Sequence, residues 1–165
     1  QERLIDIFSD KAKSQSIIFK KISLEKNKGL PSALNEGLKN TSADWVFRMD
    51  SDDICTPTRF SDQIKFQQET KADIIGGRIA EFEGQYTKSN CSLERKIPIG
   101  KIKLGMKSIL RNPFNHMTVM YKRNDILKIG GYREYKNFED YELWIRALNN
   151  GLQLANIDKV VCYVD

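Results

Sequence analysis

The sequence has few cysteines and no long apolar run. Its three cysteines, Cys55, Cys91 and Cys162, are odd in number and show no CxxC spacing. This argues against a disulfide framework and a zinc site, so we expect reduced thiols. No apolar stretch approaches the roughly 20 residues that cross a bilayer, and no signal-peptide pattern is seen. The expected compartment is therefore the cytoplasm.

What the sequence does contain is typical of one soluble globular domain. It has 165 residues, of which 40% are hydrophobic and 30% charged, and it shows no internal repeat or low-complexity segment. This length is enough for a single core, so we expect one domain over residues 1–165.

The formal net charge of +5 is unevenly distributed. Within residues 88–111, Glu94 is the only acid, and the basic residues are Lys88, Arg95, Lys96, Lys101, Lys103, Lys107 and Arg111. Such a basic segment can contact phosphates, acidic lipids or nucleic acid, although a solvated face is the commoner explanation.

Apolar periodicity predicts an alternation of helices and strands. Helical spacing occurs in residues 2–13, 30–38, 58–69, 99–110, 123–129 and 139–150, and β-type runs occur in 17–24, 45–49, 72–82, 118–122 and 154–163. Gly76 and Gly77 predict a bend in the third of these strands. The alternation in the first half predicts an α/β fold with a mainly parallel sheet flanked by helices.

Three acids follow the predicted strand 45–49. Asp50, Asp52 and Asp53 repel one another, and a divalent cation would remove that repulsion. Open α/β sheets place ligands at the carboxyl ends of strands, and Mg²⁺ is commonly held by one or two carboxylates together with substrate phosphates. An Asp-rich helix cap is the alternative, but it accounts for one Asp rather than three.

Three further residues are candidates for chemistry. Asp140 opens the helix 139–150, where the macrodipole favours an acid, so a plain cap and a general base are both open interpretations. His116 is the only histidine and is more often structural than catalytic. Lys28 precedes a helix N-terminus and is either a phosphate or base contact or an exposed lysine.

Four segments together resemble a known family. In order and spacing, NKGLPSALNEGLK, WVFRMDSDDICTPTRF, NHMTVMYKRNDILKIGGY and EDYELWIRALNNG look like a family 2 glycosyltransferase with the GT-A fold, of the type that builds bacterial polysaccharides. The resemblance covers nearly the whole chain. It implies a nucleotide-diphosphate sugar donor, expected to be UDP-linked, with Mn²⁺ or Mg²⁺ as cofactor and a carbohydrate or lipid-linked saccharide as acceptor. Nucleic acid is not an expected partner.

The resemblance implies roles for the acids. Asp52 matches the metal-binding acid of the family's DxD motif, Asp50 the acid near the ribose, and Asp53 a frequent third acid. Asp140 matches the catalytic base, which deprotonates the acceptor hydroxyl in an inverting transfer with an oxocarbenium-like transition state. A metal on Asp52 is then expected to neutralise the departing diphosphate.

Donor contacts are implied for two other residues. Lys28 falls in the region that touches the nucleotide, and His116 lies in a stretch that lines the site. A lipid-linked acceptor would give the basic helix 99–110 a peripheral contact at the inner face of the membrane.

The resemblance is incomplete at both ends. Family members begin with an apolar strand whose following loop holds the nucleotide base, and they usually continue past the strand that ends near Val164. We therefore expect a chain truncated at its N-terminus, without the first nucleotide-binding strand, and shortened at its C-terminus.

Three other interpretations compete with this one. A haloacid-dehalogenase-type phosphotransferase usually has Thr where this chain has Ile54. A calcium loop counted from Asp50 would need Gly at Cys55 and Glu at Ser61. The remaining alternative is a non-catalytic sugar- or polyanion-binding module built on an incomplete glycosyltransferase fold.

Overall fold

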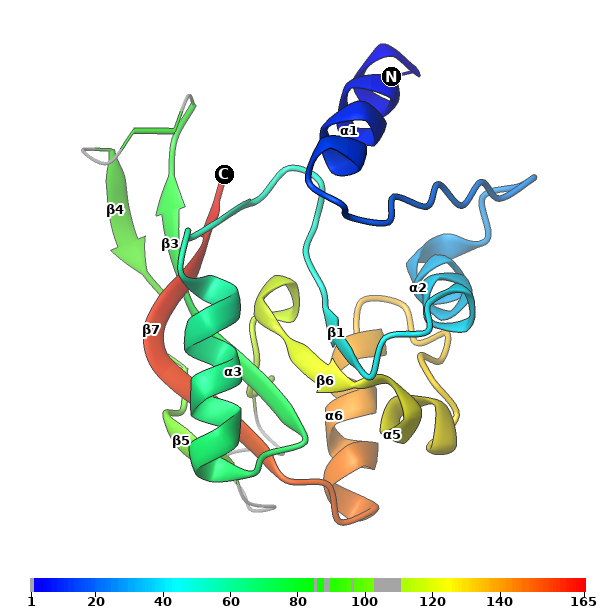
Figure 1. The fold of residues 1–165 in the computed structure, drawn as a ribbon. Helices are drawn as coiled ribbons and strands as arrows, with labels where there is room; N and C mark the ends of the chain where they lie inside the picture. Colours follow the sequence, from blue (N-terminus) through cyan, green and yellow to red (C-terminus); the bar gives the residue numbers. More distant parts are fainter. Residues whose placement is uncertain (1, 85, 88–89, 96, 103–110) are drawn as a thin grey trace.

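The computed structural model describes residues 2–84, 86–87, 90–95, 97–102 and 111–165 (Figure 1). The helices are α1 (Glu2–Ser14), α2 (Gly29–Asn40), α3 (Arg59–Thr70), α5 (Arg123–Lys128) and α6 (Glu139–Asn149), with a 3-10 helix η1 (His116–Thr118). The strands are β1 (Trp45–Phe47), β2 (Ile54–Cys55), β3 (Ile74–Phe82), β4 (Cys91–Glu94), β5 (Gly100–Ile102), β6 (Met120–Lys122) and β7 (Leu154–Val164). None of the helices in these ranges has the length and apolar character needed to cross a membrane.

The strands form one mixed sheet in the order β1-β6-β3-β7-β2, with β4 paired to β3 and β5 paired to β7. The predicted α/β fold with flanking helices is confirmed. The strand directions differ from the prediction, because β3 and β7 form the one parallel pair in the described part of the chain. Since β1 and β3 are each antiparallel to β6, they run in the same direction but are separated by it. Residues 118–122 were predicted to form a strand, but the alternation rule did not predict that this strand lies between β1 and β3 and antiparallel to both.

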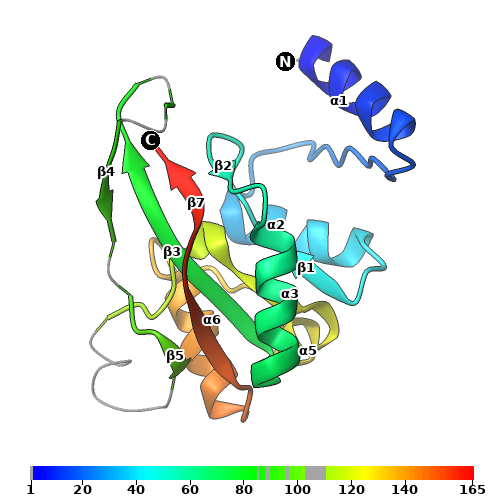
Figure 2. The same cartoon turned by 60° about the vertical axis from the view of Figure 1, so that its left-hand side comes forward.

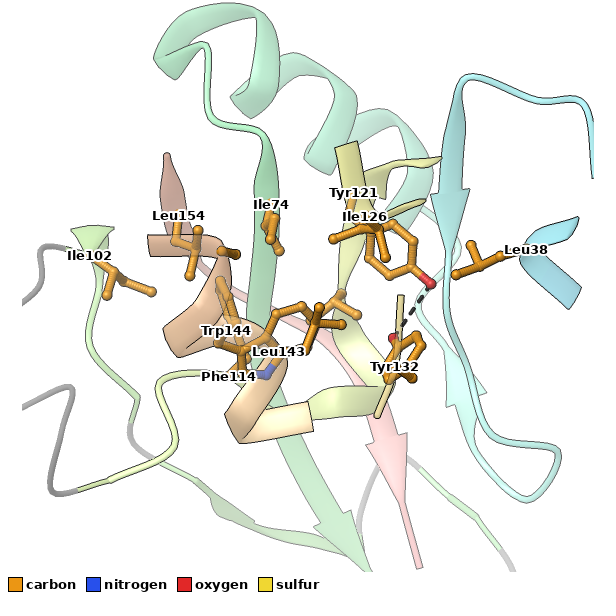
Figure 3. Close-up of a cluster of buried hydrophobic side chains, with 12 residues drawn as sticks. Leu38, Ile74, Ile102, Phe114, Tyr121, Ile126, Tyr132, Leu143, Trp144 and Leu154 are labelled. Carbon is orange, nitrogen blue, oxygen red and sulfur yellow. Dashed lines mark hydrogen bonds between the residues drawn. The ribbon is translucent and has the colours of Figure 1, made fainter. Parts of the chain in front are cut away.

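Adjacent residues on the central strands pack against opposite layers. The register aligns Ile74 of β3 with Tyr121 and Leu154, and all three belong to the core cluster that also contains Leu143 and Trp144 of α6 (Figure 3). The next residues along these strands are Ile75, Met120 and Ala155, which pack on the other face with Phe66 of α3. Because side chains alternate across a strand, the central strands are buried on both faces. Figures 1 and 2 show α3 and α6 on opposite sides of the sheet.

The two glycines of β3 allow close packing beside a bulge. A Cβ on Gly76 would lie 2.4 Å from both Asn156 Oδ1 and Phe114 Cδ1. The pairing of β3 with β7 shifts register on both sides of Arg78, and the extra residues of β7 include Asp158, which forms an ion pair with Arg78. This confirms the irregularity predicted from the glycine pair.

Two predictions differ from the structure in the part of the chain that it describes. Residues 17–24 form no strand, and Ile18 is 95% exposed. A strand needs a partner for its N–H and C=O groups, and no described segment pairs with these residues, which lead to α1 at a distance from the sheet (Figures 1 and 2). The predicted helix 99–110 begins instead with β5, because residues 100–102 pair with β7. Residues 103–110 lie outside the described residues.

The basic segment is described only in part. Lys88, Lys96, Lys103 and Lys107 lie outside the described residues. Arg95 pairs with Glu81 at 2.9 Å, and both are at least one-third exposed. An exposed pair of this kind contributes about 0 to 1 kcal/mol to stability.

Candidate functional site

The three acids of the sequence motif lie together in one pocket. They occupy the turn between β1 and β2, so the end of a half-buried strand delivers them to the edge of the sheet. The pocket has a volume of about 640 Å³ and is lined by Asp50, Asp52, Asp53, Ile79, Glu81, Phe82, Glu83, Arg95, Met117, Val164 and Asp165. Arg95 is the single cationic side chain of this lining, against six carboxylates. The pocket therefore favours a cation or a ligand that brings one.

A buried arginine supports the acidic turn. The Arg48 guanidinium is 6% exposed, and its Nη1 donates to Asp50 Oδ2 at 2.6 Å. The Arg48 carbonyl accepts a hydrogen bond from Arg59 Nη2 at 2.7 Å, and Arg59 Nε donates to Gln63 Oε1 within α3. Because Arg59 is itself buried, the backbone just before the acids is fixed to the first turns of α3.

Asp53 has the surroundings expected of a cation ligand. Burial raises the pKa of its carboxyl, and the negative charges of Asp50 and Asp52 raise it further. Its Oδ2 is buried and has no hydrogen-bond partner among the described residues. A divalent cation would satisfy this oxygen and offset the repulsion, so the residues present fit Mn²⁺ or Mg²⁺.

The described residues do not form a complete metal cage. They contain no group of three or more His, Cys, Asp or Glu side chains arranged to hold a metal ion. This agrees with a site in which one or two carboxylates share the ion with phosphate oxygens of a ligand.

His116 lies beside this region as a neutral side chain. Its Nε2 is 3.1 Å from the Tyr132 hydroxyl, and its ring lies edge-on to Trp144 at 6.0 Å. Burial and the nearby positive charge of Arg48 lower the pKa of His116 to about 3. His116 therefore acts near neutral pH through hydrogen bonding and shape rather than through charge.

Asp140 is held in a defined orientation at the start of α6. Its Oδ1 accepts the backbone N–H of Tyr141 at 2.7 Å, and its Oδ2 accepts the amide of Asn112 at 2.6 Å. Asn112 is oriented in turn, because its Oδ1 accepts the backbone N–H of Phe114 at 3.1 Å. The carboxylate is thus held both by the backbone of its own helix α6 and by a side chain from the distant segment that contains Asn112.

Asp140 does not line the pocket that holds the three acids. Tyr132, which contacts His116, is influenced from both sides: burial is the main cause that raises the pKa of its hydroxyl, the negative charge of Asp140 raises that pKa further and the positive charge of Arg48 lowers it. Tyr132 also lies 3.4 Å from the Tyr121 hydroxyl (Figure 3).

Lys28 belongs to a different pocket. It lies at the N-terminus of α2 and lines a volume of about 450 Å³ together with Gly29, Leu30, Pro31, Glu134, Tyr135, Lys136, Asn137 and Glu139. The structure therefore brings Asp50, Asp52 and Asp53 into one pocket, but not Lys28. Glu139, the residue before Asp140, faces the Lys28 pocket.

Some residues of the site were missed from the sequence. Arg48 carried a usable signal, because a charged side chain inside the apolar run WVFRM needs a buried partner. Asn112 and Asn35 carried no such signal in the sequence. An asparagine that orients a distant carboxylate or backbone segment cannot be distinguished by sequence from an ordinary turn or surface asparagine. Asn35 exchanges two hydrogen bonds of 2.8 Å with the backbone of Tyr132.

Residues 2–133 match the family model described as glycosyl transferase family 2. The chain belongs to this family. It is 41% identical over 145 residues to an uncharacterized glycosyltransferase of Haemophilus influenzae, covering 87% of this chain and 53% of that protein. It is 34% identical to the amylovoran biosynthesis glycosyltransferase AmsE of Erwinia amylovora, again covering 87% of this chain and 53% of the relative. The chain thus spans about half the length of these curated relatives.

Solved structures show the same fold. The crystal structure of S. aureus TarS 1–349 in complex with UDP-GlcNAc matches with a TM-score of 0.70 and 20% identity, over 96% of this chain and 45% of that one. The mannosyltransferase PcManGT from Pyrobaculum calidifontis, in complex with GDP-Man and Mn²⁺, matches with a TM-score of 0.65 and 13% identity, over 95% of this chain and 42% of that one. The expected GT-A-type fold is confirmed.

Proposed function

We propose that this chain forms the donor-binding and catalytic part of an inverting, metal-dependent glycosyltransferase, which transfers a sugar from a nucleotide-diphosphate sugar to a saccharide acceptor in surface polysaccharide assembly. One observation carries the proposal: three carboxylates at the end of β1 line one pocket, in which Asp53 Oδ2 is buried without a hydrogen-bond partner among the described residues. Because the chain spans about half of its relatives, the proposal concerns the full-length protein.

On the donor side, Asp52 is the proposed metal ligand and Asp50 the ribose contact. The ion pair with Arg48 keeps the Asp50 carboxylate in place before any ligand arrives. Asp53, Lys28 and His116 are the further proposed donor contacts. A divalent cation held at Asp52 would neutralise the charge of the leaving diphosphate.

On the acceptor side, Asp140 is the proposed general base. The hydrogen bonds from Asn112 and from the Tyr141 N–H fix the direction of its carboxylate. An ionised carboxylate in a fixed position can accept the proton of an acceptor hydroxyl as that oxygen attacks the anomeric carbon. Attack from the face opposite the diphosphate inverts the anomeric configuration.

The names of relatives support a UDP-linked donor and a lipid-linked acceptor. An Escherichia coli relative, 36% identical over 86% of this chain and 51% of its own length, is named UDP-Gal:alpha-D-GlcNAc-diphosphoundecaprenol beta-1,3-galactosyltransferase. TarS was solved with UDP-GlcNAc, and PcManGT with GDP-Man and Mn²⁺. These findings support a nucleotide-sugar donor with Mn²⁺ as the first ion to test, and a lipid-linked acceptor. That the acceptor is presented at the cytoplasmic face of the membrane is part of the proposal.

The proposal is tested by titrating UDP into the full-length protein by calorimetry, with and without Mn²⁺. The wild type is expected to bind UDP with Mn²⁺, and Asp52→Ala to lose the Mn²⁺-dependent part. Asp44→Ala is the matched control, because Asp44 is an exposed aspartate just before β1. Unchanged binding in Asp52→Ala contradicts the metal assignment. Salt-sensitive binding to nucleic acid with no affinity for any nucleotide sugar would favour the non-catalytic polyanion-binding module instead.

A further inference from the structure

Two of the three cysteines lie opposite each other on neighbouring strands of the sheet. Strand β2 is antiparallel to β7, and the register places Cys55 directly opposite Cys162. Both are free thiols. They are 107 positions apart in the chain, and nothing in the sequence pattern relates them.

The local hydrogen bonding favours a close approach of the two side chains. Thr56 N donates to Val161 O at 3.0 Å, which makes the pair next to Cys55 and Cys162 a hydrogen-bonded one. In an antiparallel ladder such pairs alternate with non-hydrogen-bonded pairs, whose Cα atoms are about 4.5 Å apart and whose side chains are closer together. A disulfide spans Cα atoms about 4.4 to 6.8 Å apart, so the backbone already has a suitable spacing.

The surroundings make the two thiols unequal. Cys55 is partly exposed, whereas Cys162 is fully buried. Burial raises the pKa of Cys162 to about 12. The Arg59 guanidinium lies 4.0 Å from Cys162 Sγ, and Cys55 is the residue directly opposite Cys162 in the sheet, so the pair lies next to a buried cation. Oxidation is therefore expected to begin at Cys55.

We propose that Cys55 and Cys162 form a reversible disulfide when the protein meets a hydroperoxide. The Cys55 sulfur first attacks the peroxide, which gives a sulfenic acid and releases water when the oxidant is hydrogen peroxide. The Cys162 sulfur then displaces hydroxide from that sulfenic acid, the S–S bond forms and a second water leaves. The protein loses two electrons and two protons to the peroxide. A dithiol reductant reverses the reaction, and the inference is independent of the proposed transferase activity.

The experiment treats the full-length protein with hydrogen peroxide, blocks the remaining thiols and digests with trypsin without reduction. The expected product links peptide 49–59 to the peptide that begins at Val160, and it weighs two hydrogen masses less than their sum. Dithiothreitol should abolish it. Because the bond closes a long loop, the oxidised protein should melt roughly 5 °C higher, and dithiothreitol should reverse this shift.

Two variants keep the test specific. Cys91→Ser should retain both the linked peptide and the melting shift. Cys55→Ser should lose both and leave Cys162 available to the blocking reagent after unfolding. A disulfide that joins Cys55 to another cysteine, or oxidation of Cys55 only to sulfinic or sulfonic acid, would overturn the proposal. Two unoxidised thiols after peroxide treatment would do the same.

Discussion

The side chain of Asn35 pairs with the backbone of Tyr132 across 97 positions of the chain. Asn35 Nδ2 donates to the Tyr132 carbonyl and Asn35 Oδ1 accepts the Tyr132 N–H, each at 2.8 Å. A Cβ on Gly131 would lie 2.5 Å from Asn35 Oδ1, so a glycine is needed beside this contact. The pairing fixes α2 to the loop that leads to Asp140, and through the Tyr132 hydroxyl it supports His116.

Asn35→Ala should destabilise the protein, because it leaves the N–H and C=O of Tyr132 without these partners. A buried polar group left unsatisfied costs about 1 to 3 kcal/mol, so we expect a loss of about 2 kcal/mol. Urea unfolding of the full-length protein followed by tryptophan fluorescence measures it. Asn149→Ala, at an exposed asparagine near the end of α6, should stay within about 0.5 kcal/mol of the wild type. Equal midpoints for the two variants would contradict the role of Asn35.

Gly76→Ala should be destabilising, although alanine is the smallest possible addition. Its methyl group would overlap Asn156 Oδ1 and a ring carbon of the buried Phe114, both at 2.4 Å. Such overpacking costs about 1 to 3 kcal/mol. Gly37→Ala is the matched comparison, because a Cβ there meets nothing within 4 Å. Within helix α2 that change should stabilise by about 0.5 to 1 kcal/mol, so the melting temperatures of the two variants should move in opposite directions.

His116 should make the protein less stable in acid. Its pKa falls from 6.5 to about 3 on folding, so between these values the unfolded chain binds a proton that the folded chain does not. Stability from this residue is thus present above about pH 6.5 and decreases as the pH falls toward 3. In His116→Gln this contribution disappears, and the slope of unfolding free energy against pH should be smaller by up to about 1.4 kcal/mol per pH unit. Urea midpoints at pH 7, 6 and 5 give the comparison, and parallel slopes would contradict a buried neutral histidine.

Asp140→Asn should stop sugar transfer and leave donor binding intact, given the proposed function. Loss of a general base typically costs about 10²- to 10⁴-fold in rate. The measurement pairs kcat for transfer with the dissociation constant for UDP in the presence of Mn²⁺. Retained turnover would place the base elsewhere.

Asn112→Ala tests whether the Asp140 carboxylate needs its partner. Removing the 2.6 Å hydrogen bond frees the carboxylate to turn, and misplacing a reacting group by about 1 Å can cost 10²-fold. We expect kcat to fall by about 10- to 100-fold with little change in KM for the donor. Asn112→Asp keeps the size but places a second acid beside Asp140, so it should not restore activity. A change in donor KM with kcat unaffected would indicate a structural role instead.

The elements that were predictable from sequence are those whose residues carry their own pattern. Leu30, Leu34 and Leu38 share one face of α2, so helical periodicity located that helix. Ile74 and Ile75 lie on a strand buried on both faces, which a short continuous apolar run indicates. Residues 17–24 have the composition of a strand, yet composition supplies no hydrogen-bond partner. The position of β6 between β1 and β3 depends on register between segments distant in the chain, and a local pattern contains no such information.

In the candidate site too, the features predictable from sequence are the local ones, and those that depend on distant segments were not predictable. The acids of the β1–β2 turn are close together in the sequence, so their spacing alone was enough to group them. Asp140 could be selected as an acid at a helix start, but Asn112, which orients it, could not. The separation of Lys28 from the acid pocket is likewise a property of three-dimensional packing.

The sheet order has a consequence for how the protein folds. Strands β1 and β2 lie at the two ends of the order β1-β6-β3-β7-β2, so the short turn that carries the acids is attached at opposite sides of the sheet. One attachment pairs residues 45–47 with 120–122, and the other pairs 54–55 with 162–163. Contacts this distant in sequence form slowly, since long loops must close first. During synthesis, the acidic pocket can therefore form only after the ribosome has released β7.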